Sequence, residues 1–332
     1  MINMKDINHI FVINLKKDTE RWETMKQQFN NTSYSIIRWD AVYGKELDEA
    51  YIKEITDTFC NIGCSYSIIG CWLSHYSLWK YIAENDLTDV LILEDDVTIT
   101  NFDENVKTIL SEIPDDYDMV YFDCIGSCDL EYSILTEMKK QDKLFTPAFP
   151  LGMYAYMLSN KGAKKLVEYD VLKKVRYHID FTLSNTIHHK KDFKMYALRN
   201  SFISTLTTDA ESNLTSTNHP VLTSLLSLIP LSKDKTEYTM GYVCDVQLLN
   251  IRALNIPITA LFFIILLISL FIGVFGSEKM KSLFISTLLL LYILEIVMTK
   301  GRNVNYIIIE ALCVYILIQL GTYISTIIST SK

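Results

Sequence analysis

Residues 90–97, with the sequence VLILEDDV, place four apolar residues directly before three carboxylates. A short apolar run of this kind is typical of a strand buried on both faces of a sheet. In open α/β sheets, ligands bind outside the carboxyl ends of the strands, where Glu94, Asp95 and Asp96 would then lie. Neighbouring carboxylates ~4–6 Å apart repel one another by roughly 2–4 kcal/mol per pair at intermediate dielectric. A divalent cation would offset this repulsion; a solvated acidic turn is the alternative interpretation.

The rest of the first ~220 residues alternates between strand-like and helix-like patterns. Further strands are predicted at His9–Leu15, Tyr34–Asp40, Met119–Phe122 and Gly152–Leu158. A helix before the acidic run is predicted from apolar residues at helical spacing, namely Ile68, Trp72, His75, Trp79 and Ile82. This alternation predicts one α/β domain with a Rossmann-like, mostly parallel sheet.

Charge and cysteine usage narrow the class of protein. A net charge of −8 and a pI near 5.3, without a basic stripe, exclude a nucleic-acid-binding protein. The pairs Cys60/Cys64 and Cys124/Cys128 lack the CxxC-and-His spacing of a zinc site. Because the N-terminus also lacks the apolar core of a signal peptide, we expect all seven cysteines to be reduced, and a disulfide between some of them is the alternative interpretation.

The last ~80 residues predict membrane helices. Glu295 and Glu310 interrupt the apolar stretches, and we expect them to reach toward Lys300 and Arg302 rather than to line a proton or ion path. Two or three spans are possible, and we choose three. The apolar stretches are Ile256–Gly276, Ser282–Thr299 and Val304–Ile328.

These patterns predict three regions: a domain over residues 1–220, a connector over 221–255 and a transmembrane region over 256–328. Basic residues near the ends of three spans are in modest excess on the side of the α/β domain. We therefore predict a multi-pass membrane protein with a cytoplasmic catalytic domain.

Six sequence blocks in a fixed order resemble glycosyltransferase family 25, the family of lipopolysaccharide-type β-galactosyltransferases and procollagen galactosyltransferases. The resemblance covers roughly residues 9–215. The blocks are IFVINLKKDTERWETM (Ile10–Met25), DAVYG (Asp40–Gly44), IGCWLSHYSLW (Ile69–Trp79), VLILEDDV (Val90–Val97), GMYAYMLSNKGAKKL (Gly152–Leu166) and ESNL (Glu211–Leu214).

The resemblance implies a GT-A fold, a UDP-sugar donor and inverting transfer of a hexose of the galactose or glucose type. Metal-dependent members of the family carry an acidic motif at this position, which implies Mn²⁺ or Mg²⁺ on Glu94 and Asp96. A cation there would neutralise the charge that develops on the leaving diphosphate. The donor itself is predicted to contact Asn14, Arg21, His75 and Asp95.

Inversion requires a carboxylate base that takes the proton of the acceptor hydroxyl. Asp180 fits the family's late acidic position and is the predicted base, with Glu211 as the alternative. His75 also lies on the apolar face of its helix, so a hydrogen-bonded core histidine is the competing interpretation.

One position departs from the family pattern. The family commonly has Glu two residues before the Gly-Cys of the cysteine–serine–histidine helix, where this chain has Ile68. A catalytically inactive sugar-nucleotide-binding scaffold is therefore the second hypothesis, and a metal-dependent hydrolase is a third. For the transferase, the predicted acceptor is a glycan, a lipid-linked sugar or a protein near the membrane.

Overall fold

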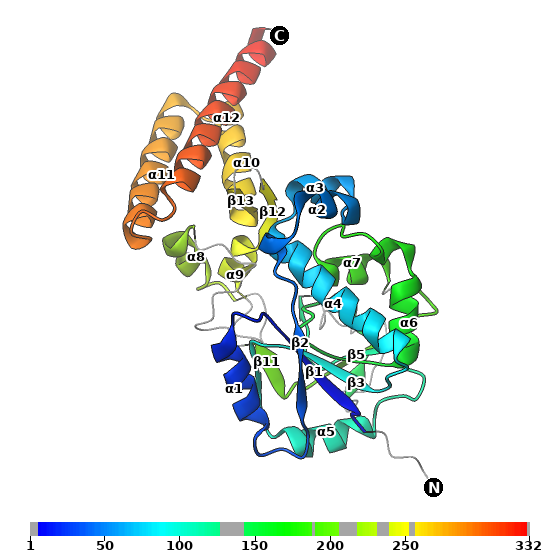
Figure 1. Cartoon of the computed structure of the whole chain (residues 1–332). Helices are drawn as coiled ribbons and strands as arrows, with labels where there is room; N and C mark the ends of the chain where they lie inside the picture. The colour runs from blue at the N-terminus through cyan, green and yellow to red at the C-terminus, as the bar shows by residue number, and fades with distance from the viewer. Residues whose placement is uncertain are drawn as a thin grey trace. The chain divides into compact units, whose positions relative to one another are not determined.

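The computed structural model describes residues 6–126, 143–187, 190–205, 218–230, 239–251 and 256–330. The chain divides into two compact units, Met1–Ala210 and Glu211–Lys332. The first unit holds the α/β sheet and the second holds the apolar C-terminal helices (Figure 1). The boundaries predicted from the sequence for the domain, the connector and the transmembrane region stay predictions.

Unit 1 is built on a seven-stranded sheet with the order β2-β1-β3-β9-β5-β10-β7. Five strands run in one direction, while β9 and β7 run in the other. This confirms the predicted α/β class with a mostly parallel, Rossmann-like sheet. The strands are β1 (His9–Asn14), β2 (Ile36–Asp40), β3 (Val90–Glu94), β5 (Met119–Tyr121), β7 (Leu144–Phe145), β9 (Ala155–Leu158) and β10 (Met195–Leu198).

Helices and two small sheets complete unit 1 (Figure 1). Strand β4 (Val97–Ile99) pairs with β11 (Ile203–Thr205), and β6 (Ile125–Gly126) pairs with β8 (Pro150–Leu151). The helices are α1 (Thr19–Phe29), η1 (Gly44–Glu46), α2 (Glu49–Ile55), α3 (Thr58–Gly63), α4 (Tyr66–Glu84), α5 (Phe102–Leu110), α6 (Asn160–Glu168), η4 (Asp170–Leu172) and α7 (Ile179–Thr186).

The core explains why the apolar run of β3 is continuous. Leu91 and Leu93 belong to one cluster with Met25 of α1 and Val106 of α5. The intervening Ile92 points to the opposite face and is also fully buried. Because both faces are covered, no position before Glu94 tolerates a polar residue.

The parallel pairing brings polar strand ends to one edge of the sheet. In the register of β1 with β3, Ile13 lies opposite Glu94, so Asn14 and the turn at Asp95 and Asp96 are neighbours at this edge. The loop at the end of β3 is short, because β4 begins at Val97. The edge predicted to hold the ligand is therefore the edge at which the acidic turn lies.

The prediction of seven reduced cysteines is wrong. Cys60 and Cys64 are joined by a disulfide across the C-terminus of α3. Cys124 is also disulfide-bonded, whereas Cys71, Cys244 and Cys313 are free. A CxxxC pair on a six-residue helix can close because the last turn brings the two residues together, with their Cα atoms 4.5 Å apart.

In the described part of unit 2, two helices are long and apolar enough to cross a membrane, Glu278–Met298 (α11) and Val304–Thr330 (α12). The first apolar stretch is shorter than predicted because Ile256–Thr259 forms strand β13, which pairs with β12 (Gln247–Ile251). Helix α10 (Ala260–Phe275) has 16 residues, about 24 Å at 1.5 Å per residue. That is less than a ~30 Å hydrocarbon core. The remaining helices are α8 (Pro220–Leu226) and α9 (Met240–Asp245).

The expectation that Glu295 and Glu310 reach toward Lys300 and Arg302 is wrong. Both side chains are buried, and neither is paired with Lys300 or Arg302 in the described part of the chain. Glu310 accepts from Tyr292 at 3.0 Å and lies 2.8 Å from Nε2 of His219. The two oxygens of Glu295 accept the backbone N–H groups of residues 221 and 222, in the first turn of α8, each at 2.8 Å. The carboxylates turn inward because partners inside the unit satisfy them.

Candidate functional site

Asp95 is held by two groups from the N-terminal strand–loop–helix segment. Asn14, at the end of β1, donates from Nδ2 to its Oδ2 at 2.5 Å. Arg21, in the first half of α1, donates to its Oδ1 at 3.0 Å. Burial raises the pKa of Asp95, and these two partners counteract the rise. Asp95 therefore organises the turn, and three of the four predicted donor-binding residues meet in this one contact.

Asp96 is the carboxylate in the turn with the fewest compensating contacts. Its Oδ1 is buried without a hydrogen-bond partner among the described residues, and its Oδ2 lies 3.8 Å from Arg21. Burial, followed by repulsion from Glu94 and Asp95, raises the pKa of Asp96 to about 7. A buried carboxylate oxygen without a donor, beside other carboxylates, fits a divalent cation with oxygen ligands.

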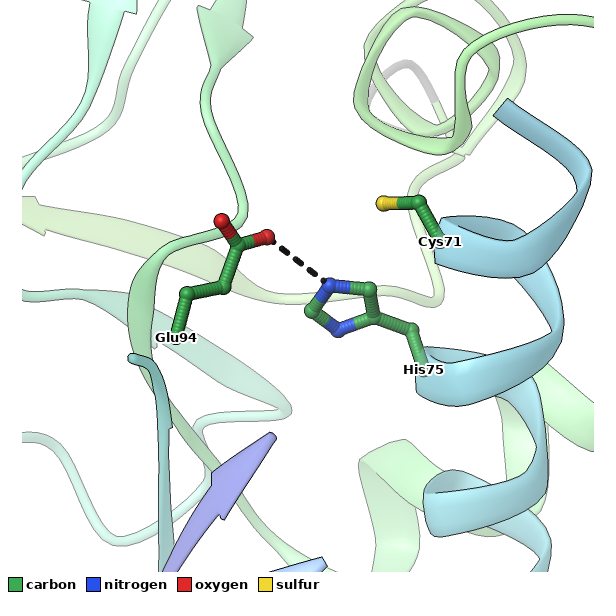
Figure 2. A group of neighbouring side chains, drawn as sticks. All are labelled: Cys71, His75 and Glu94. Atoms are coloured by element: carbon green, nitrogen blue, oxygen red, sulfur yellow. Dashed lines mark hydrogen bonds and ion pairs between the residues drawn. The ribbon is translucent and has the colours of Figure 1, made fainter. Parts of the chain in front are cut away.

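Glu94 is contacted from the other side by α4. Nε2 of His75 lies 3.2 Å from Oε1 of Glu94, and Figure 2 shows the imidazole edge facing the carboxylate. Nδ1 of the same ring lies 3.0 Å from the hydroxyl of Tyr156 on β9. Trp79 donates its indole N–H to that hydroxyl at 2.7 Å. His75 is thus both a buried core residue and a neighbour of the acidic turn.

Cys71 is a site residue that the sequence analysis did not single out. Its sulfur lies within 4.8 Å of the ligand atoms of His75 and Glu94, and Figure 2 shows the three side chains converging from α4 and β3. Burial and then the negative charges of Glu94, Asp180 and Asp96 raise the pKa of the Cys71 thiol well above its ordinary value. The spacing of Cys71 and His75, four residues apart on one helix, is the signal that could have found it.

Asp180 lies in the first turn of α7. Its Oδ2 accepts the backbone N–H of Gly152 at 2.9 Å and its Oδ1 that of Phe181 at 2.7 Å. Gly152 has a φ of +83°, a conformation that side chains rarely adopt. Helix α7 packs against α4, the helix that carries Cys71, and the negative charge of Asp180 is one of the lesser causes that raise the pKa of that thiol. Glu211, the alternative base, lies outside the described residues.

The geometry therefore brings seven of the eight predicted site residues to the carboxyl ends of β1 and β3, to α1 and α4 beside them, and to α7. Asn14, Arg21 and Asp95 bond one another, while Glu94 and Asp96 remain as the carboxylates with capacity for a cation. The network of Tyr156 and Trp79 behind His75 was not predicted, because their apolar spacing is the same as that of ordinary core residues.

Comparison with known proteins gives one family for this region. Residues 7–183, just over half of the chain, match the family described as Glycosyltransferase family 25 (LPS biosynthesis protein). Every described site residue lies within these limits.

Curated relatives match over the same half of the chain. A glycosyltransferase 25 family member of Drosophila melanogaster is 31% identical over 180 residues, which are 51% of this chain and 29% of the relative. Procollagen galactosyltransferase 1-A of Xenopus laevis is 28% identical over 181 residues, with the same coverage. Human procollagen galactosyltransferase 2 is 27% identical over 177 residues, 48% of this chain and 27% of the relative. This chain thus spans less than a third of the length of these relatives. The family match over more than half of its residues shows that the chain belongs to glycosyltransferase family 25.

Proposed function

We propose that this protein is an inverting glycosyltransferase that moves a hexose, galactose in the first instance, from a UDP-sugar to an acceptor hydroxyl. The observation that carries the proposal is the acidic turn after β3, where Asp96 has a buried oxygen without a partner inside the family-matched region. Family membership and two relatives named procollagen galactosyltransferases support the reaction class and the sugar. The sheet with one reversed strand beside β3 is compatible with a GT-A domain.

The proposed cofactor is Mn²⁺ or Mg²⁺ on Glu94 and Asp96. When bound, it would supply positive charge that stabilises the diphosphate leaving group. The residues fit such an ion because oxygen ligands suit these hard cations and because Oδ1 of Asp96 is buried without a hydrogen-bond partner among the described residues. Arg21 contributes a second positive charge to the turn, 3.8 Å from Asp96.

Asp180 is the proposed base. Each of its oxygens accepts one backbone N–H, which fixes the orientation of the carboxylate and leaves further lone pairs for the acceptor proton. General-base assistance of this kind contributes about 10²–10⁴-fold to the rate. Glu211 remains the alternative base.

The acceptor is proposed to be a glycan, a lipid-linked sugar or a protein close to a membrane. The two candidate membrane helices of unit 2 support attachment to a bilayer. For the side of the membrane, the excess of basic residues counted for the three spans expected from the sequence predicts a cytoplasmic unit 1. The Cys60–Cys64 disulfide is instead typical of an oxidising compartment.

The test is nucleotide release by the full chain in detergent, with a panel of UDP-, GDP- and CMP-sugars and Mn²⁺. We expect release from UDP-galactose that disappears with chelator and falls at least about 10²-fold in Asp96→Asn, because the leaving-group charge is then poorly neutralised. Asp170→Asn is the matched control, since that carboxylate is 92% exposed and pairs with Lys173.

Three outcomes contradict the proposal. Binding of a donor without turnover, even with membrane acceptors, supports the inactive scaffold. Transfer to water alone supports a hydrolase. Absence of donor binding in the full chain removes the nucleotide-sugar hypothesis.

A further inference from the structure

We propose that Cys71, His75 and Glu94 form a binding site for one zinc-class cation, Zn²⁺ or Co²⁺. This site has a sulfur and a nitrogen ligand and differs in chemistry from the oxygen pair proposed for Mn²⁺ or Mg²⁺. Its binding function stands independently of the transferase activity. Its consequence for catalysis, through the shared Glu94, rests on the proposed function.

The three ligand atoms already converge. The sulfur of Cys71, the imidazole nitrogen of His75 and a carboxylate oxygen of Glu94 all lie within 4.8 Å of one another. The nitrogen–oxygen pair is 3.2 Å apart. Ligand atoms around one tetrahedral zinc ion lie roughly 3.3–3.6 Å apart, given zinc–ligand bonds of about 2.0–2.3 Å. A shift of the thiol by about 1 Å, within the range of side-chain rotation, is therefore sufficient to complete the geometry.

The ligands come from regular elements, which limits the positions that they can take. Cys71 and His75 are four residues apart on α4, a helix of 19 residues whose N-terminus is capped by Ser65. Glu94 is the last residue of β3. Figure 2 shows the thiol and the imidazole projecting from successive turns of α4 toward the carboxylate. Three protein ligands with a free fourth position are the arrangement of an accessible zinc site.

A second layer of hydrogen bonds orients His75, as is usual for metal-binding histidines. Trp79 donates to the oxygen of Tyr156, so the O–H of Tyr156 can donate to Nδ1, which leaves the ring proton on Nε2 facing Glu94. In the absence of a cation, the Nε2 proton therefore occupies the position of the ion.

Binding can be written with all protons balanced. The cation takes the Nε2 lone pair while the ring proton moves to Nδ1, and Tyr156 accepts from it. The thiol of Cys71 loses its proton and becomes a thiolate ligand. One proton is thus released per cation bound, and no redox step is involved.

The thiolate and imidazole determine which cations bind. Such ligands favour zinc-class ions over Mg²⁺ and Ca²⁺, which prefer oxygen. If Glu94 also serves the catalytic cation, a zinc-class ion at this site withdraws Glu94 from Asp96. Zn²⁺ is then an inhibitor of the transferase.

The test is titration of the full chain with Co²⁺ in detergent, without thiol reductants. A thiolate-to-cobalt charge-transfer absorption identifies sulfur ligation directly. We expect one equivalent of Co²⁺ to produce the band and to release one proton in unbuffered solution. Zn²⁺ should remove the band, whereas Mg²⁺ in large excess should not.

The variants are chosen so that misfolding cannot imitate the result. Cys71→Ser should weaken Co²⁺ binding by more than about tenfold and abolish the band, because loss of even an outer-shell partner costs 10–100-fold. Cys313→Ser is the matched control at a free thiol of unit 2. The double variant Cys244→Ser/Cys313→Ser removes the other two free thiols of the described residues and leaves Cys71. It should retain the band.

The proposal is overturned if the full chain gives no band, if the band survives Cys71→Ser, or if the double variant loses it. Because the spectrum does not require turnover, these results are independent of the transferase assay. Inhibition is a separate measurement: Zn²⁺ should suppress Mn²⁺-supported nucleotide release in the unmodified chain and much less in Cys71→Ser. If the chain binds Co²⁺ as expected but Zn²⁺ does not inhibit nucleotide release, only the shared use of Glu94 is refuted, and the metal site itself stands.

Discussion

At the scale of single residues, adjacent carboxylates have different roles because their neighbours differ. Asp95 receives an amide and a guanidinium, whereas Asp96, one residue further, keeps a buried oxygen without a donor among the described residues. Glu94 instead faces an imidazole. In the sequence alone the three acids are equivalent, and the folded turn gives each of them different neighbours.

The raised pKa of Asp96 makes stability depend on pH. The pKa of Asp96 is about 7 in the folded chain, whereas its ordinary value, which we take for the unfolded chain, is 3.8. Between these values the cation-free folded chain binds more protons at Asp96 than the unfolded chain, so this contribution to stability falls as pH rises through the window. In chelator, the thermal midpoint of the unmodified chain should fall relative to Asp96→Asn from about pH 4 to about pH 7. Parallel pH profiles for the two proteins would contradict the assignment.

Tyr156→Phe removes the hydroxyl shared by His75 and Trp79. Two buried polar groups then lose their partner, and each unsatisfied group costs about 1–3 kcal/mol. We expect a lower thermal midpoint of unit 1 and weaker Co²⁺ binding, measured by differential scanning fluorimetry and the cobalt band. Tyr196→Phe, at a half-buried position of β10 in the same sheet, should leave both values nearly unchanged.

At the scale of elements, the helices of unit 2 share an apolar cluster, and among their described residues a glycine crossing and a buried polar contact add to it. Gly273 of α10 and Gly321 of α12 approach so closely that a Cβ on Gly321 would lie 2.8 Å from backbone atoms of Gly273. Small residues at such a crossing are typical of membrane helix pairs. The second contact joins α8 to α11 and α12 through the buried His219, Glu295 and Glu310.

Gly321→Val should separate α10 from α12, because the added side chain meets backbone rather than a movable side chain. Overpacking of this kind costs about 1–3 kcal/mol or more. We expect faster labelling of Cys244, a buried thiol of unit 2, on heating in detergent. Thr326→Val, at an exposed position of the same helix, should label at the rate of the unmodified chain.

His219→Ala removes the imidazole partner of Glu310, a buried carboxylate that also accepts from Tyr292. Breaking a buried pair in this way costs about 3–5 kcal/mol. The same thiol-labelling measurement should show destabilisation of unit 2, and a second change, Glu310→Gln, should recover part of it. A double variant that is no more stable than His219→Ala would show that Glu310 does not depend on this histidine.

At the scale of the whole molecule, two signals disagree on the side of the bilayer that unit 1 would occupy under the proposed membrane attachment. The count of basic residues predicts that Asn31, exposed at the end of α1, is inaccessible from outside intact cells. A cysteine introduced there should then resist a membrane-impermeant maleimide until the cells are permeabilised. Labelling of intact cells would overturn the cytoplasmic prediction and would agree with the disulfide between Cys60 and Cys64.

The sequence by itself determined the class of the fold, because a strand buried on both faces must be apolar at every position and a helix must repeat near 3.6 residues. It also located the acidic turn, since Glu94, Asp95 and Asp96 end such a strand. It did not determine the direction of β9, whose apolar run is the same whichever way the strand points.

Only the tertiary structure decided which groups meet. Cys71 and His75 acquire their significance from Glu94, 19 residues beyond His75 in the chain and 3.2 Å away in space. The glutamates of α11 and α12 turn inward because His219 and the start of α8 lie within reach. Such contacts depend on the packing of elements distant in sequence, and local periodicity carries no information about those partners.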